Sequence, residues 1–271
     1  MMLELARGAW VCVTLLLAIT TATAADEIPG APVTTWDDGW APPPSREITL
    51  RVEVPDGLVL EGLLVLPDRD PVPEAGYPLA LLLHSFGRSR DGLLPLADEL
   101  AAAGIASALV DMRGHGSSRA TAEGKPYVFD RGLAAIMRFA VTDAVHVLKA
   151  ATARPEVDGR RVAVVGVGEG GLVAASVAAR TPGVGALVLV DTARQEAGVD
   201  VGAELQRLGP RPALLVCSGV QTSQRRAREL SAQGEGAREA RCVNAFADEE
   251  RLLGYGQQAT REVVAWLSAR W

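Results

Sequence analysis

Two apolar runs near the start of the predicted folded region alternate with polar residues. The segments REITLRVEV (46–54) and LVLEGLLVL (58–66) place apolar side chains at about every second position and flank Pro55-Asp56-Gly57. A period of two indicates half-exposed strands, and Pro-Asp-Gly is a turn sequence. The pattern predicts an antiparallel hairpin at the start of the domain.

From residue 78 onward, short and nearly continuous apolar runs are separated by segments with helical periodicity. The runs lie at 78–84, 105–111, 161–166, 185–191, 212–217 and 240–246, and the helical segments at about 93–103, 131–153, 170–180, 222–233 and 257–269. Continuous apolar strands separated by helices indicate a parallel sheet covered on both faces. With the hairpin, the prediction is an α/β fold with a mostly parallel eight-stranded sheet. Only about twenty residues separate the runs that end at 191 and begin at 212, so we expect no lid domain.

The N-terminal segment has the layout of a secretory signal peptide. Arg7 precedes an apolar run at 9–19, and Ala22 and Ala24 are spaced like an A-x-A cleavage site. The run is shorter than the roughly 20 residues that cross a bilayer, and an uncleaved anchor is the alternative. We predict a signal peptide at 1–24, a proline-rich linker at 25–45, a single domain at 46–271, and export to the periplasm or beyond.

Composition excludes several classes of function. The chain has 271 residues, is 48% apolar, and carries a net charge of −6, so it lacks the basic surface that nucleic acid or anionic membranes require. It contains three histidines and no cysteine pair at metal-ligand spacing, so we expect no metal and no cofactor. The expected partner is a small ligand or a protein.

Cys217 and Cys242 each lie in an apolar run that is predicted to be a strand. In an exported protein a disulfide between them would persist if the two strands are neighbours. The alternative is that both are buried small hydrophobic residues, because the register between the strands is unknown from sequence.

The stretch GVGEGG (166–171) has two interpretations. It satisfies G-x-G-x-x-G after a predicted strand and before a predicted helix, and Asp191 ends the next strand, as in dinucleotide-binding folds. However, the hairpin and two further strands precede this unit, whereas the dinucleotide motif usually belongs to the first unit of its sheet. Dinucleotide binding is kept as an alternative.

The second interpretation comes from LLLHSFGRSRDGLLPLADELAAAGIASALVDMRGHGSS (81–118). Its strand ending in His84-Ser85-Phe86-Gly87 and its turn Asp111-Met112-Arg113-Gly114-His115-Gly116-Ser117 resemble the α/β-hydrolase superfamily, and the dienelactone-hydrolase-like and serine-aminopeptidase-like branches are the nearest. The resemblance extends over about 46–271 and implies an α/β-hydrolase fold.

The resemblance also implies where a catalytic triad would lie. The nucleophile turn G-x-S-x-G falls on residues 166–170, and Gly168 stands at the serine position. The acid position aligns with Gln221 and the histidine position with Asp248. No histidine follows His146 anywhere in the chain. Without an oxygen or sulfur atom at residue 168, no acyl-enzyme can form there.

The backbone donors of an oxyanion hole would survive these substitutions. By resemblance they are the N–H groups of Phe86 and Glu169, in a pocket that also includes His84, Ser85 and His115. We therefore predict an exported, catalytically inactive relative that binds a ligand or partner. The alternative is a hydrolase with relocated groups, in which Ser85 acts with His115 or Glu169 activates water.

Overall fold

A computed structural model of the chain describes residues 44–127, 132–247 and 249–271, all within one compact unit, Ala41–Trp271. The predicted signal peptide lies outside the described residues, as does the predicted linker apart from its last two residues. Among the described residues, no helix is both long enough and apolar enough to cross a membrane.

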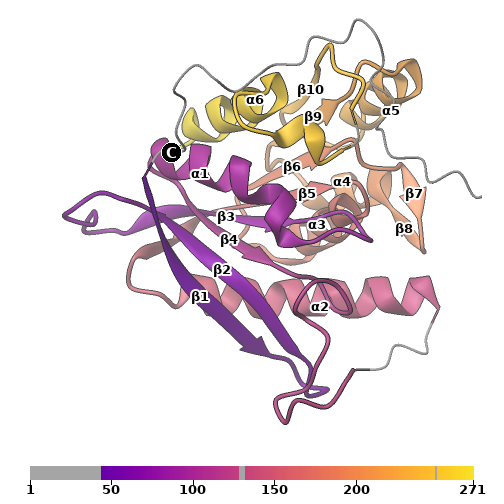
Figure 1. The fold of residues 1–271 in the computed structure, drawn as a ribbon. Helices are drawn as coiled ribbons and strands as arrows, with labels where there is room; N and C mark the ends of the chain where they lie inside the picture. The colour runs from indigo at the N-terminus through magenta and orange to yellow at the C-terminus, as the bar shows by residue number, and fades with distance from the viewer. Residues whose placement is uncertain (1–43, 128–131, 248) are drawn as a thin grey trace, which may run out of the picture. The chain divides into compact units, whose positions relative to one another are not determined.

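The domain is built on a single eight-stranded sheet with the order β1-β2-β4-β3-β5-β6-β9-β10 (Figure 1). The strands β1 and β2 form the predicted antiparallel hairpin, β2 also pairs antiparallel with β4, and all other neighbours are parallel. The predicted fold class is confirmed. The strands are β1 (Ser45–Glu53), β2 (Val59–Pro67), β3 (Tyr77–Leu83), β4 (Ala106–Val110), β5 (Val157–Val167), β6 (Ala186–Val190), β9 (Ala213–Cys217) and β10 (Arg238–Cys242).

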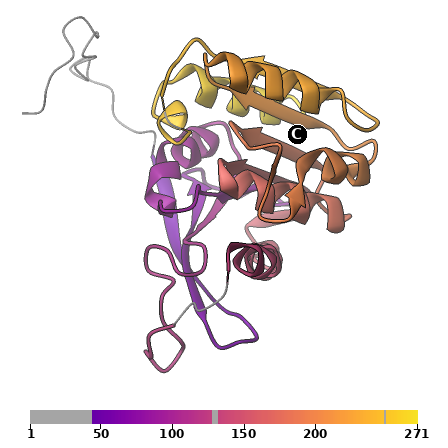
Figure 2. The same cartoon turned by 90° about the vertical axis from the view of Figure 1, so that its right-hand side faces the viewer.

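Helices cover both faces of this sheet, as Figure 2 shows. Because side chains alternate along a strand, Leu79 and Leu81 of β3 pack in one core with α2 to α5, whereas Ala80 and Leu82 pack in the other core with α1 and α6. The helices are α1 (Leu94–Ala102), α2 (Leu133–Thr152), α3 (Glu169–Arg180), α4 (Val201–Leu208), α5 (Gln221–Ser231) and α6 (Gln258–Ser268), with short 3₁₀ helices η1 (Arg90–Leu93) and η2 (Arg251–Leu253).

The segment between β6 and β9 contains structure that the apolar pattern did not predict. It forms a two-stranded hairpin, β7 (Gln195–Glu196) and β8 (Val199–Asp200), followed by α4. The strands of two residues are too short to show alternation. Helix α4 buries Val201, Leu205 and Leu208 on one side, and Asp200 caps it by accepting a hydrogen bond from the Ala203 N–H at 3.2 Å.

The last strand begins and ends earlier than the apolar pattern predicts. The prediction was 240–246, but β10 ends at Cys242, where it pairs with the last residue of β9, Cys217. Two backbone hydrogen bonds, from the Val243 N–H to the Cys217 oxygen and from the Gly219 N–H to the Ala245 oxygen, join the chains beyond this pair, but the regular ladder ends there and residues 243–247 form a loop. The two paired cysteines are joined by a disulfide with a Cα separation of 4.4 Å.

Candidate functional site at the carboxyl edge of the sheet

The turn between β5 and α3 is centred on Gly168. Its backbone has φ 53° and ψ −121°, a conformation that glycine adopts without the steric cost of a Cβ atom. A Cβ placed on this residue would collide with Ser85 Oγ and lie 3.6 Å from Glu249 Cδ. The space above the turn is therefore filled by side chains from two other segments.

The first of these segments follows β3. The side chain of Ser85 is buried, and its Oγ donates a hydrogen bond to Glu169 Oε2 at 2.5 Å. The same carboxylate oxygen accepts a hydrogen bond from the Phe86 N–H at 3.2 Å. The backbone donor that the resemblance implies for an oxyanion is thus bonded to an anion of the chain itself.

The second segment is the loop after β10, where two consecutive carboxylates approach the turn. Glu250 Oε1 accepts a hydrogen bond from the Ser85 N–H at 3.2 Å, and Glu249 is the second residue, after Ser85, that a side chain at Gly168 would contact. Asp248, the residue aligned with a triad histidine, lies outside the described residues. Glu249 and Glu250 were not among the predicted site residues. Their position next to Asp248, in the loop where the resemblance places the histidine, could have indicated that they lie near the turn.

Gln221, aligned with the triad acid, is the exposed first residue of α5. No hydrogen bond between described residues joins it to Gly168, Ser85 or Glu169. The structure therefore brings Ser85, Phe86, Glu169 and Gly168 together and leaves Gln221 on the surface.

His84 links two turns of this edge as a neutral ring. Its Nδ1 lies 2.8 Å from the Ser85 carbonyl oxygen, so it carries the proton, and its Nε2 accepts a hydrogen bond from the Met112 N–H at 2.9 Å. Burial removes solvent from the ring and lowers the pKa of His84 to about 4. Both nitrogens bond to backbone groups, so His84 positions the Ser85 turn.

His115 packs against the same edge through its ring. Its Nδ1 lies 3.0 Å from the Arg113 carbonyl oxygen, and its ring centroid lies 5.3 Å from that of His84 and 5.2 Å from that of Phe86. Among the described residues, no hydrogen bond joins His115 to Ser85. A serine with a histidine base is therefore not assembled here, whereas a serine bonded to a carboxylate is.

Comparison with known proteins agrees with this arrangement of strands and turns. The sequence profile of the family described as "Serine aminopeptidase, S33" matches residues 78–231, more than half of the chain. The chain belongs to this family and to the α/β-hydrolase superfamily. The predicted resemblance is confirmed at this level. No curated protein matches the sequence.

Solved structures of distant relatives share the fold. The chain is similar to a dienelactone hydrolase from Anabaena variabilis, with a TM-score of 0.60 and 21% identity over 83% of this chain and 96% of that one. An esterase from Pyrococcus furiosus gives 0.62 and 15% over 84% and 92%. A hypothetical protein from Pseudomonas aeruginosa gives 0.67 and 13% over 88% and 98%. At these identities the likeness establishes the fold alone.

In this S33 family member, the turn after β4 is held by buried charges. Asp111 accepts hydrogen bonds from the Arg90 and Ser117 N–H groups, each at 2.9 Å. The Arg113 guanidinium donates to both carboxylate oxygens of Asp143 on α2, at 2.5 and 2.7 Å. The turn from Asp111 to Ser117 is therefore tied to helix α2, and its charged residues stabilise the fold.

The glycines of GVGEGG pack α3 closely against the sheet. A Cβ on Gly170 would collide with the carbonyl oxygens of Leu83 and His84, and one on Gly171 would collide with Thr192. Close packing alone accounts for these two glycines, because no side chain fits between α3 and the end of β3 or between α3 and Thr192.

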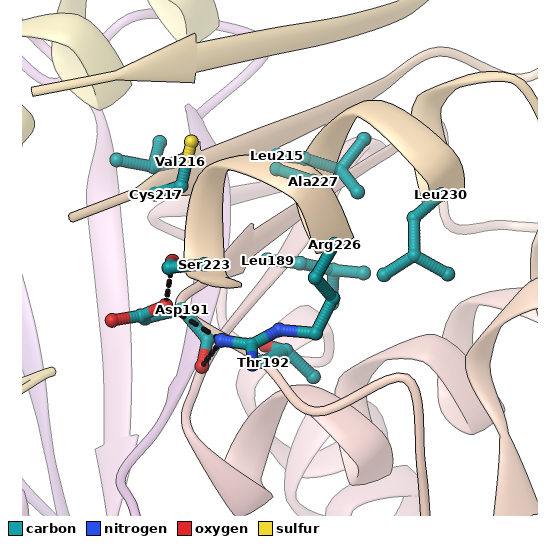
Figure 3. Close-up of a pocket in the computed structure, with 10 residues that line it drawn as sticks. All are labelled: Leu189, Asp191, Thr192, Leu215, Val216, Cys217, Ser223, Arg226, Ala227 and Leu230. Carbon is teal, nitrogen blue, oxygen red and sulfur yellow. Dashed lines mark hydrogen bonds and ion pairs between the residues drawn. The ribbon is translucent and has the colours of Figure 1, made fainter. Parts of the chain in front are cut away.

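Asp191, which the dinucleotide interpretation assigned to a ribose, is already bound by the protein. Figure 3 shows its carboxylate held by Ser223 and Arg226 of α5, and Arg226 Nη2 lies 2.7 Å from Oδ1. The cavity beside it measures about 10 Å³, about enough for one water molecule. Asp191 has φ 47°, a strained angle for a residue with a Cβ atom. The described residues contain no cluster of three or more metal-ligating side chains.

Proposed function

We propose that this protein is an exported, non-catalytic α/β-hydrolase-fold protein that acts by binding a small ligand or a protein partner. One observation carries the proposal. The Glu169 carboxylate accepts a hydrogen bond from the Phe86 N–H, which is a donor that a hydrolase needs for its oxyanion. The turn beside this contact has glycine, and so no nucleophile, at the nucleophile position.

Electrostatics supports the loss of acyl transfer. The oxyanion of a tetrahedral intermediate is stabilised by donors that are free in the ground state. Here a substrate oxygen would have to displace one carboxylate and would then face the charges of Glu169, Glu249 and Glu250. Each added negative charge near the developing oxyanion opposes its formation. Removal of a triad also costs on the order of 10⁶ in rate.

The single most direct test is hydrolysis of short p-nitrophenyl esters. We expect the wild-type rate to equal that of buffer with a heat-treated sample, and Ser85→Ala to leave it unchanged. A wild-type rate well above that background would contradict the proposal. Treatment with a fluorophosphonate followed by mass spectrometry is the second readout, and we expect no labelled residue.

A second candidate function is favoured by one contact. The 2.5 Å hydrogen bond between Ser85 Oγ and Glu169 Oε2 is the geometry of a nucleophile with a general base, and Ser85 Oγ lies beside the position of a side chain at Gly168. A relocated hydrolase of this kind predicts ester turnover that disappears in both Ser85→Ala and Glu169→Gln. It also predicts a fluorophosphonate adduct on Ser85.

Dinucleotide binding is the remaining alternative and has its own readout. It predicts enhancement of NADH fluorescence that Asp191→Ala abolishes. We expect no enhancement, because Asp191 is engaged by Arg226 and Ser223.

Export is supported by the disulfide between Cys217 and Cys242, since such bonds persist in oxidising compartments. Expression of the full chain in a bacterium with fractionation tests this part. We expect the protein in the periplasm or medium, with an N-terminus after Ala24 by intact mass. An uncleaved chain in the cytoplasmic fraction would contradict it.

A further inference from the structure

A cavity of about 430 Å³ opens on the helical face that carries α2, α3 and α4, lined by none of the residues around Gly168. It lies between the N-terminal half of α2, the C-terminal half of α3 and the β7–β8 hairpin, which stands near that end of α2 in Figure 1. Cavities of about 300–1,000 Å³ are the usual size for small-molecule sites. The apolar part of its lining includes Met137, Val141 and Val199.

A buried carboxylate with one unused oxygen lines this cavity. Glu204 is only 3% exposed, and its Oε1 accepts from Arg180 Nη2 at 2.8 Å and pairs with Arg207 Nη1 at 3.2 Å. Its Oε2 is buried and has no hydrogen-bond partner among the described residues. A buried acceptor without a donor is rare and destabilising, so a donor from a bound molecule would satisfy it.

An exposed cation, which has no side-chain partner in the part of the chain that the structure describes, lines the same cavity. Arg138 on α2 is exposed and lines the cavity. Among the described residues its guanidinium forms no hydrogen bond or ion pair. Arginine presents a planar set of donors that matches a carboxylate in a bidentate geometry.

The hairpin that forms one wall of the cavity is strained at its tip. Ala197 has φ 49° and Gly198 has φ 82°, and both residues line the cavity. Glycine takes such angles freely, whereas alanine does so at a cost of about 1 kcal/mol. The Cβ of Ala197 packs against the core, so this side chain is retained at a position where glycine would relieve the strain.

We propose that this cavity binds a small carboxylic acid with an apolar side chain and a hydroxyl or ammonium donor, that is, an apolar α-hydroxy acid or α-amino acid. The carboxylate pairs with Arg138, the donor bonds to Glu204 Oε2, and the apolar side chain packs against Met137, Val141 and Val199. All three requirements come from groups that line one cavity. The cavity shares no lining residue with the Gly168 turn, so ligand binding there does not depend on whether that turn is catalytic.

Four matched probes test separately whether binding requires the carboxylate and whether it requires the hydroxyl or ammonium donor: L-phenylalanine, L-phenyllactate, 3-phenylpropionate and phenethylamine. The first two carry both polar groups, the third lacks the donor, and the fourth lacks the carboxylate. At about ten times Kd, we expect L-phenylalanine or L-phenyllactate to raise the Tm of the wild-type protein by roughly 3–6 °C. We expect calorimetry to show at least tenfold weaker binding of the other two. If L-phenylalanine binds more tightly than L-phenyllactate, the ligand class is the α-amino acids. If L-phenyllactate binds more tightly, the ligand class is the α-hydroxy acids.

Two variants locate the binding. Arg138→Gln removes the cation, and Val199→Trp places a large side chain in the cavity from the hairpin while Arg138 and Glu204 keep their identities. We expect each to weaken the better probe at least tenfold. Arg225→Gln, on the exposed face of α5 and outside the cavity, is the matched control and should bind like wild type.

Two results would overturn the proposal. One is the absence of any Tm shift with all four probes in the wild-type protein. The other is binding that Arg138→Gln and Val199→Trp leave unchanged, which would place the ligand elsewhere. Neither result bears on the ester-hydrolysis test, which probes Ser85 and Glu169.

Discussion

The Oγ of Ser85 lies too close to the position that a Cβ atom on Gly168 would take, so the two residues cannot both carry their side chains in the present arrangement. The usual nucleophile of the fold is therefore excluded twice, by the identity of residue 168 and by the side chain that takes its space. A carboxylate, Glu169, then fixes the serine in place. Restoring a serine at 168 would require this cluster to move.

Gly168→Ser should consequently be more destabilising than backbone strain alone. The positive φ costs about 1 kcal/mol, and crowding against Ser85 adds about 1–3 kcal/mol to the loss in free energy of unfolding. We expect no ester hydrolysis in this variant, because the chain has no histidine after His146. Urea denaturation measures the stability.

Two variants separate crowding from strain in this experiment. Gly57→Ser is the matched control, because Gly57 has φ 84° but open space within 4 Å of a Cβ. It should lose only the strain energy. Adding Ser85→Gly to Gly168→Ser should recover about 1 kcal/mol or more of the free energy of unfolding. If the losses of the two single variants simply add in the double variant, residues 85 and 168 are not in contact as described.

The ion pair between Arg113 and Asp143 should contribute far more to stability than surface pairs do. Their side chains are 1% and 6% exposed, so Asp143→Asn removes the negative charge that balances the buried Arg113 guanidinium. We expect the free energy of unfolding to fall by about 3–5 kcal/mol. Glu229→Gln, which breaks pairs of Arg194 and Arg225 at the surface, should cost less than about 1 kcal/mol. Equal losses measured by urea denaturation would contradict this difference.

The lowered pKa of His84 should make the protein less stable in mild acid. Burial lowers its pKa to about 4, whereas in the unfolded chain it titrates near 6.5. Below pH 6.5 the unfolded state takes up a proton that the folded ring resists. The contribution is fully present above that pH, and on the order of 3 kcal/mol is lost by pH 4. Urea midpoints between pH 7 and 5 should fall less steeply in His84→Gln, and parallel profiles would contradict the assignment.

Reduction of the disulfide should destabilise the edge of the sheet. Cys217 and Cys242 close a loop with a sequence separation of 25, for which chain entropy predicts a loss of about 3–4 kcal/mol. Thermal melts with and without dithiothreitol measure this loss. Cys217→Ala with Cys242→Ala should melt like the reduced protein and be insensitive to dithiothreitol, and a persistent effect of dithiothreitol on that variant would point to another cause.

Much of the fold followed from local pattern. Continuous apolar runs predicted the central strands, because strands buried on both faces need apolar side chains at every position, and the alternation around Pro55-Asp56-Gly57 predicted the hairpin. The hairpin β7–β8 escaped prediction because strands of two residues are too short to show alternation. Helix α4 does place Val201, Leu205 and Leu208 at helical spacing, but at eight residues it is shorter than the segments from which helices were predicted. The end of β10 was misplaced because the regular pairing with β9 stops at Cys217 and Cys242, although the apolar pattern continues through residues 243–246.

For the site, the sequence by itself determined what is missing: a hydroxyl at 168 and any histidine after 146. Those are properties of residue identity and need no geometry. Only the tertiary structure decided what takes their place. Ser85, Glu169 and Glu249 come from three segments far apart in the chain, and the parallel sheet brings the ends of those segments to one edge. The bridge between Cys217 and Cys242 likewise depended on a register that is set by backbone pairing across strands, which no local pattern encodes.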